Sequence, residues 1–238
     1  SIGNVVGIVT GFGLFGLMLV LPLFLQIVLN FDPWQTGLVL LPGAIATALS
    51  MPIAGNLVGR IDARWSIAFG LIGSGVSAWW LGSFSQQAGY WDIFWPRVLQ
   101  GFTLGFLFVP LSTVTLAGIE RSRLSNATGL GTLLRQLGGS FGIAILTTLL
   151  VWKEKHAFNS LTSNVSQAHY GVRQYLHSAA SQSHALMQIS GMLQKDAALI
   201  SFNFLFRVSA IVFFCSVPLV LLLPKVTRRG VVASPAGD

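Results

Sequence analysis

Arginine and glutamine side chains occur close together inside two otherwise apolar stretches of this 238-residue chain. Arg97 is followed by Gln100, and Arg135 is followed directly by Gln136. A third arginine, Arg207, lies in the last apolar stretch. An arginine in the middle of a membrane costs about 2.5–3.5 kcal/mol on insertion scales, so it usually faces a cavity or a polar partner. We therefore expect the Arg and Gln pairs to line a cavity. The alternative is that they only fix helix packing.

Aromatic side chains in the first apolar stretch and in the stretch that contains Arg97 are candidates for contacts to an apolar ligand. Packing inside the protein core is the alternative for each of them. The four phenylalanines selected for such contacts are Phe12, Phe15, Phe24 and Phe106.

Catalytic and metal chemistry find little support in the motifs. Residues 138–142 match the G-x-S-x-G pattern around Ser140, but that pattern needs a turn from a strand to a helix and nearby His and Asp partners. Here it lies in an apolar stretch, and every histidine lies between residues 156 and 184. The spacing of those histidines matches no metal motif. We expect no enzyme activity, no metal and no cofactor.

Composition indicates that lipid surrounds the elements that carry these residues. The chain is 53% hydrophobic and 9% charged, whereas soluble domains carry about 25% charged residues. The net charge is +7, but the positive residues lie in short clusters between apolar stretches rather than on one polar face. That distribution is not typical of a nucleic-acid-binding surface, so no nucleic-acid partner is predicted.

Six stretches are long enough for spanning helices, which need about 20 mostly apolar residues. The sequence predicts an all-α membrane protein, a bundle of six transmembrane helices, because backbone groups in lipid must bond within the chain. The predicted spans are residues 5–29, 34–58, 65–84, 93–117, 127–151 and 198–223. The domain organisation is then five spans in 1–151, an extracytoplasmic loop at 152–197 with a surface helix near 179–194, the last span in 198–224, and a cytoplasmic tail at 225–238.

The positive-inside rule predicts how the helices are oriented. Lys and Arg residues occur in the joints near residues 59–64 and 120–123 and in the tail, whereas the joints near 30–33 and 85–92 have none. We therefore place the first set in the cytoplasm, and the second set, with the 152–197 segment, outside. At the 30–33 joint, Asp32 is predicted to cap the next helix and Pro33 to begin it.

Glycines spaced four residues apart predict close contacts between helices, because they let two backbones approach. Such pairs are Gly101 with Gly105, and Gly138 with Gly142.

Three stretches together suggest a family: residues 21–26 with 36–42, residues 96–110, and residues 126–142. They resemble the major facilitator superfamily, in particular the fourteen-helix drug:proton antiporters of EmrB/QacA type. A fourth stretch resembles a degenerate copy of the superfamily's cytoplasmic loop motif, with glycine at position 59 where aspartate is usual. The residues of this loop motif are Gly55, Gly59, Arg60, Asp62 and Arg64.

The resemblance implies that the chain is the C-terminal six-helix half of a longer transporter in the inner membrane. It implies a cavity between the first, second, fourth and fifth helices, with Gln26 on its wall. The expected partners are membrane lipid, lipophilic or amphipathic small molecules, protons and the N-terminal half of the same protein. Some members of the family also work with a periplasmic adaptor and an outer-membrane channel. No acidic residue lies deep in a predicted span, so the coupling carboxylate is expected in the N-terminal part.

Two alternatives remain open at this point. One is a major facilitator carrier for another solute, such as a metabolite or a siderophore. The other is a non-transporting membrane subunit.

Overall fold

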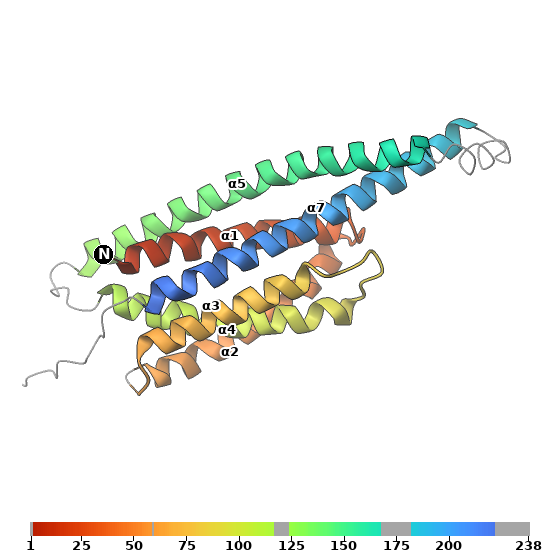
Figure 1. Cartoon of the computed structure of the whole chain (residues 1–238). Helices are drawn as coiled ribbons and strands as arrows, with labels where there is room; N and C mark the ends of the chain where they lie inside the picture. The colour runs from red at the N-terminus through yellow and green to blue at the C-terminus, as the bar shows by residue number, and fades with distance from the viewer. Residues whose placement is uncertain (1, 59, 117–123, 168–181, 222–238) are drawn as a thin grey trace, which may run out of the picture.

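The chain folds into six long helices that run up and down beside one another (Figure 1). The computed structural model describes residues 2–58, 60–116, 124–167 and 182–221. Within these ranges the regular elements are all helical, which confirms the predicted all-α fold. The helices are α1 (Ile2–Ile27), α2 (Pro33–Leu57), α3 (Ala63–Leu81), α4 (Tyr90–Leu116), α5 (Leu124–Gln167) and α7 (Gln182–Leu221).

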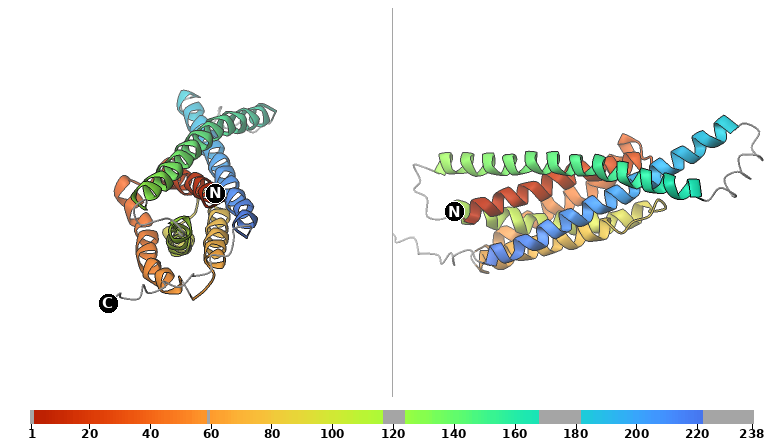
Figure 2. Two further views of the ribbon diagram at one scale, coloured as in Figure 1. Left: turned by 90° about the vertical axis from the view of Figure 1, so that its left-hand side faces the viewer. Right: turned by 45° about the horizontal axis from the view of Figure 1, so that its top comes forward.

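Length and composition allow five of the described helices to cross a membrane: α1, α2, α4, α5 and α7. The shortest helix, α3, is not among them, because many Gly, Ser and Trp residues dilute its apolar content. It nevertheless packs along α4 and α7 at the side of the bundle. The end-on view in Figure 2 shows α4 between α2 and α3.

The start of α2 follows the predicted capping chemistry. The backbone nitrogen of Gln35 donates to Oδ1 of Asp32 over 2.6 Å, and the backbone nitrogen of Asp32 donates to Oε1 of Gln35 over 3.2 Å. This reciprocal pair satisfies two amide groups that a helix start otherwise leaves open. Pro33 is the first helical residue. The prediction for Asp32 and Pro33 is therefore confirmed.

Helix pairing follows an order different from the order along the chain. α1 packs along α5, α2 packs along α4, and α3 lies against α4 and α7. The consecutive helices α1 and α2 make few contacts, and so do α4 and α5. The space near α1, α2 and α4 is consequently left partly open.

Glycines lie where the paired helices approach most closely. A Cβ atom at Gly101 would overlap the backbone of Gly43, and one at Gly138 would overlap the backbone of Ile8. Gly105 lies in the same way against Ser50, and Gly142 lies against Phe12. We call these two contact lines the α2–α4 seam and the α1–α5 seam.

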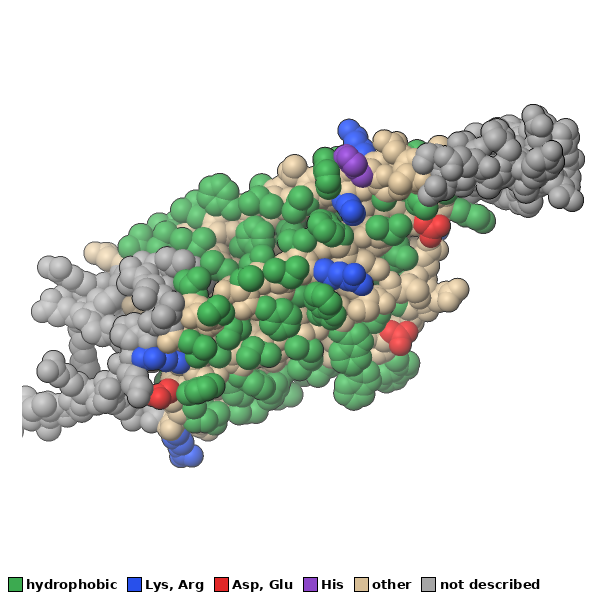
Figure 3. All heavy atoms as spheres, in the orientation of Figure 1, with side chains coloured by type: hydrophobic (Ala, Val, Ile, Leu, Met, Phe, Trp, Pro, Cys, Tyr) green, Lys and Arg blue, Asp and Glu red, His purple; other side chains and the backbone are tan. Residues whose placement is uncertain are grey.

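The outer surface is apolar, as expected for a protein surrounded by lipid. Figure 3 shows hydrophobic side chains over most of the middle of one face. The interior is also apolar and contains the rings of Phe24, Phe202 and Phe206 in edge-to-face contact. Apolar residues therefore occur both inside and outside, as a helix bundle in a membrane requires.

The segment predicted as a loop at 152–197 is helical wherever it is described. α5 continues without interruption to Gln167, and α7 already begins at Gln182, so both extend beyond the other helices (Figure 1). The loop prediction is wrong there because polar residues exclude lipid but do not exclude a helix. The surface helix predicted near 179–194 is part of α7 from Gln182 onward, and residues 168–181 lie outside the described ranges. Whether this segment faces the outside of the cell stays a prediction.

Candidate functional site

A cavity of about 490 Å³ opens between α1, α2 and α4. Its wall is mainly apolar, with Leu, Met and Phe side chains from α1 and Leu side chains from α2. The polar side chains on the wall are Thr47, Arg97 and Gln100. The site therefore combines a large apolar surface with a small polar patch, which is the usual composition of a small-molecule site.

Arg97 and Gln100 form the polar patch. They lie three residues apart on α4, so they face the same side of the helix. Nη1 of Arg97 donates a hydrogen bond to Oε1 of Gln100 over 2.5 Å. Gln100 is buried, and Nε of Arg97 is buried with no hydrogen-bond partner in the structure. The guanidinium thus has one buried donor that no described protein group uses.

Gly43 on α2 makes room for this guanidinium. A Cβ atom at position 43 would lie 3.1 Å from Nε of Arg97, closer than such contacts normally allow. Thr47, one turn further along α2, donates to the carbonyl oxygens of Gly43 at 2.8 Å and of Gly101 at 3.0 Å. The polar patch is therefore held between α2 and α4 at their closest approach.

Arg135 on α5 is not on the cavity wall, in contrast to the expectation from sequence, but it contacts a residue that is. Its guanidinium carbon lies 5.1 Å from the centre of the Phe108 ring, within the range of a cation–π contact. Phe108 belongs to α4 and lines the cavity. Nε of Arg135 is buried without a hydrogen-bond partner in the structure. Arg135 thus links α5 to the cavity wall through an aromatic ring, although α4 and α5 make few contacts.

The other predicted cavity residues divide into two groups. Phe15 lines the cavity beside Arg97 and Gln100. Phe12 is partly buried and packs on the core, while Gln26 and Gln136 are exposed and are not part of the cavity wall.

Phe24 and Phe106 do not line this cavity, in contrast to the expectation from sequence. Phe24 is fully buried against Phe202 and Phe206 of α7, and Phe106 packs against Phe69 of α3. The reason is that both helices are apolar on several faces, so composition does not reveal which face meets the cavity.

Sequence reasoning did not select Met18, Thr47 and Phe108 as cavity residues. Met18 is 73% exposed on the cavity wall, three residues after the selected Phe15. A usable signal existed for Phe108, which lies eleven residues after Arg97 and so returns, after about three helical turns, to nearly the same face of α4. No comparable signal marks Thr47.

The cytoplasmic loop motif forms local contacts rather than a pocket. Nη1 of Arg64 donates to the carbonyl oxygen of Leu221 over 3.4 Å, which ties the start of α3 to the end of α7. Asp62 precedes α3 without a side-chain capping bond, and Arg60 is exposed. No atom lies near the missing side chain of Gly55. Gly59, Arg121, Arg123 and the tail at 225–238 lie outside the described residues.

Ser140 has no catalytic partners in the described part of the chain. It lies inside α5, and its hydroxyl donates to the carbonyl oxygen of Gln136 over 3.0 Å. A nucleophilic serine instead needs an adjacent base. Across the described ranges, no group of three or more His, Cys, Asp or Glu side chains is placed to hold a metal.

The described acidic residues lie near helix ends or in the extension of α5 and α7. Asp92 is in the first turn of α4, where its carboxylate accepts from the backbone of Gly89 over 2.8 Å. Asp196 accepts a hydrogen bond from the Gln86 side chain, and Glu154 lies on α5 beyond its apolar part. None of these carboxylates is on the cavity wall.

Comparison with known proteins matches residues 4–160 to the model of the Major Facilitator Superfamily. Over 213 residues, the chain is 30% identical to the multidrug export protein EmrB of Escherichia coli K12, which covers 87% of this chain and 41% of that protein. It is 27% identical to the probable multidrug resistance protein EmrY of the same organism, with coverages of 91% and 43%. It is 25% identical to the fatty acid resistance protein FarB of Neisseria gonorrhoeae, with coverages of 87% and 42%.

The chain spans about two fifths of the length of these curated relatives. The family match covers well over half of the chain and includes the helices that carry the cavity. The apolar six-helix architecture agrees with a multi-pass membrane transporter rather than an enzyme. The chain therefore belongs to the major facilitator superfamily.

Proposed function

We propose that this chain is the C-terminal six-helix half of a proton-coupled multidrug efflux transporter of the inner membrane, which exchanges drug for protons by alternating access. The observation that carries the proposal is the cavity of about 490 Å³ with apolar walls and the Arg97–Gln100 patch. Its volume falls within the range of about 300–1,000 Å³ that is usual for drug-sized ligands. The kinship to proteins named for multidrug export supports the same reading.

The walls favour a lipophilic or amphipathic substrate. Leu, Met and Phe side chains offer apolar contact without directional demands, so molecules of different shape can bind. Arg97 adds a charged donor that pairs with a carbonyl, hydroxyl or carboxylate oxygen of the substrate. In this proposal, affinity comes from the apolar wall, and the orientation of the substrate comes from Arg97 and Gln100.

Proton exchange needs a carboxylate that this chain does not provide on its cavity wall. The proposal therefore places the titrating group on the N-terminal part of the protein, opposite the cavity. A nearby cation favours the ionised form of a carboxylate, so Arg97 and Arg135 would hold that group charged until a proton competes with them. Substrate binding near Arg97 would then change how readily the carboxylate takes a proton.

Alternating access requires the halves of the protein, and helices within them, to move without losing contact. The two glycine seams support such movement, because they present nearly smooth backbone surfaces to one another. An adaptor protein that binds the outer end is compatible with the extension of α5 and α7, which reaches beyond the other helices.

A cavity-filling substitution tests the proposal in the full-length protein. Met18→Trp places a large ring in the cavity, whereas Met192→Trp makes the same change at a residue that is similarly exposed but lies on the extension of α7. We expect Met18→Trp to reduce efflux of ethidium from proteoliposomes, driven by an imposed pH gradient, by about tenfold or more, because lost contacts of about 1.4 kcal/mol correspond to that factor. Met192→Trp should leave the rate unchanged.

The same assay separates the alternatives. Dye movement that does not depend on the pH gradient would contradict proton exchange. Gradient-driven transport of a metabolite or siderophore that excludes the dye would favour a carrier for another solute. Normal dye efflux by a well-folded Met18→Trp protein would show that this cavity is not the substrate path.

A further inference from the structure

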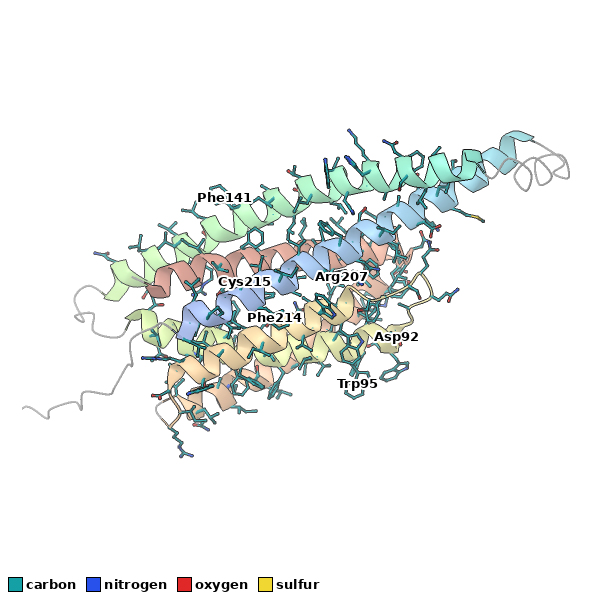
Figure 4. The ribbon with its side chains drawn as sticks, viewed as in Figure 1. Asp92, Trp95, Phe141, Arg207, Phe214 and Cys215 are labelled. Atoms are coloured by element: carbon teal, nitrogen blue, oxygen red, sulfur yellow. The ribbon has the colours of Figure 1, made fainter. Side chains whose placement is uncertain are left out.

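Arg207 lies on the exposed side of α7, close to the end of α3 (Figure 4). Its Nε donates to the carbonyl oxygen of Gly82 over 3.3 Å, and its guanidinium carbon lies 5.7 Å from the centre of the Trp79 ring. One turn earlier on α7, the Asn203 amide donates to the carbonyl oxygen of Phe84 over 2.9 Å. The cation is thus fixed at the negative end of the α3 dipole.

These contacts use only part of the hydrogen-bonding capacity of the guanidinium. An arginine has five N–H donors in a planar fork, and the hydrogen bond to Gly82 uses one. Arg207 is exposed, and the described carboxylates Asp196 and Asp92 make their hydrogen bonds with Gln86 and Gly89 instead. Arg207 is therefore a fixed cation whose described contacts include no anion.

An apolar groove of about 540 Å³ leads away from this cation along the contact of α3 and α7. It is lined by Phe214 of α7 and by one face of α3, at positions 76, 79, 80 and 83. Phe214 follows Arg207 by two helical turns, so it lies about 10 Å further along the axis. The Phe214 ring can lie against α3 because Gly75 has no side chain. Arg207, which contacts the lining residue Trp79, therefore lies beside one end of this apolar groove.

A second groove of about 390 Å³ runs along the contact of α3 and α4. It is lined by Trp80 of α3 and by one face of α4, with Trp95, Val98, Leu99 and Phe102. Trp80 belongs to both grooves, so they flank this residue on the same side of α3. Two apolar grooves therefore begin beside the end of α3.

Exposed tryptophans mark the depth of this end in the membrane. Trp79, Trp80, Trp91 and Trp95 are all about half exposed or more, and they cluster at the end of α3 and the start of α4. Figure 4 shows Trp95 projecting away from the bundle. Tryptophan is enriched where the hydrocarbon meets the headgroups. Arg207 consequently lies at headgroup level, and the grooves lead from there toward the membrane centre.

We propose that this surface binds one diacyl phospholipid, with its phosphate on Arg207 and its two acyl chains in the grooves on either side of Trp80. The guanidinium fork matches a phosphate in charge and geometry. The Ser83 hydroxyl lies on the rim of the first groove and offers a further polar group near the phosphate. Both grooves are open to the apolar surroundings, so a lipid can enter from the side. This proposal does not depend on which solute the protein transports.

Native mass spectrometry of the full-length protein tests the site. The delipidated protein is titrated with phosphatidylglycerol, phosphatidylethanolamine and, as a phosphate-free lipid, diacylglycerol. We expect both phospholipids to bind and diacylglycerol to bind at least about tenfold more weakly, since diacylglycerol cannot form the charge-assisted hydrogen bond to Arg207, and tenfold corresponds to about 1.4 kcal/mol. Equal retention of diacylglycerol would overturn the assignment of the phosphate to Arg207.

Arg207→Leu should weaken phospholipid binding by a similar factor. Lys153→Leu is the matched control, because the Lys153 ammonium also lies over an aromatic ring, that of Phe204 at 5.1 Å, but away from both grooves. Loss of lipid in both variants alike would contradict a specific site, as would full retention in Arg207→Leu.

A second variant separates lipid binding from the structural role of Arg207 at the end of α3. Val76→Trp fills the groove between α3 and α7 and leaves the guanidinium in place. We expect this variant to lose the lipid while it keeps its thermal stability. If Val76→Trp binds phospholipid as the unmodified protein does, the acyl-chain groove is not a lipid site, and the proposal fails.

Discussion

Arg97 owes its position on the cavity wall to three neighbours on two helices. Gln100 accepts its hydrogen bond, Gly43 leaves the space beside its Nε, and Thr47 bridges the backbones of the helices that carry them. A hydrogen bond from a cation is stronger than one between neutral groups, so Gln100 both orients the guanidinium and offsets part of its burial. The pair therefore acts as one unit in any contact with a substrate.

Removing Gln100 should impair transport even though the charge of Arg97 remains. We expect Gln100→Leu in the full-length protein to lower dye efflux by about tenfold or more, because a hydrogen bond to a charged group contributes about 1.5–3 kcal/mol. Gln26→Leu makes the same change at an exposed residue off the cavity wall and should have little effect. Transport rates across a range of dye concentrations would measure both, and equal losses in the two variants would refute the role of Gln100.

At the scale of single residues, the sequence identifies the polar residues of the cavity wall better than the apolar ones. Arg97 and Gln100 stand out because charge and amide groups are rare and costly in lipid. Phe15 and Phe24 look equivalent in the sequence, yet Phe15 lines the cavity and Phe24 is buried against α7. α1 is apolar on every side, so its periodicity does not show which face is turned inward. Tertiary packing decides which of Phe15 and Phe24 lines the cavity.

At the level of helices, the glycine seams are the main feature that determines packing. They bring α2 against α4 and α1 against α5 so closely that a methyl group at Gly101 or Gly138 would overlap backbone atoms. Backbone atoms cannot rotate away as a side chain can, so the helices would have to separate. Close approach also increases the dispersion contacts that hold helices together in lipid.

Gly101→Ala should therefore destabilise the full-length protein, and Gly55→Ala should not. Overpacking costs about 1–3 kcal/mol, which corresponds to a fall in Tm of several degrees. Gly55 is on α2 with no atom near its missing side chain, and alanine there favours the helix by about 0.5–1 kcal/mol. Thermal unfolding in detergent, followed by fluorescence, would compare the two. A Tm for Gly101→Ala equal to that of the unmodified protein would show that the seam is looser than described.

Helix limits inside the membrane are predictable, and those outside it are less so. The apolar stretches predicted α1 to α4 to within a few residues, because lipid leaves the backbone no choice except a helix. This argument does not apply to residues 152–167, because backbone groups in water can form hydrogen bonds with water in a loop as well as in a helix. The contact of α5 with α7, including the buried Ala157 and Ala197, stabilises the helical form there. Such a contact is not visible from hydropathy.

The whole bundle contains two similar groups of three helices. Exchanging α1 with α4, α2 with α5 and α3 with α7 preserves the two seams, the α3–α7 contact and the open α1–α2 and α4–α5 pairs, whereas the α5–α7 contact has no counterpart of similar extent between α2 and α3. α1 and α4 run in opposite directions, so the repeat is inverted. Inverted repeats are common in transporters and provide two related conformations of one architecture.

Cysteine labelling would test the orientation of the whole molecule. In a protein whose Cys215 is replaced by serine, we expect a membrane-impermeant maleimide added outside to label Asn159→Cys on the α5 extension. Arg60→Cys, between α2 and α3, should be labelled only after the membrane is opened. Asn159 and Arg60 are both exposed, so accessibility within the protein does not limit either reaction. The reverse pattern would mean that the positive-inside assignment is wrong.

α5 contains no proline along its 44 residues, and it passes from the α1–α5 seam into the extension as one rod. The part after residue 151 reaches about 24 Å at 1.5 Å per residue. A rod that pivots at the seam behaves as a lever, so a small tilt near the cavity becomes a much larger sweep at its tip. A partner bound at that tip would resist the tilt of α5. Ligand binding in the cavity would therefore alter the position of a partner that is far from the cavity.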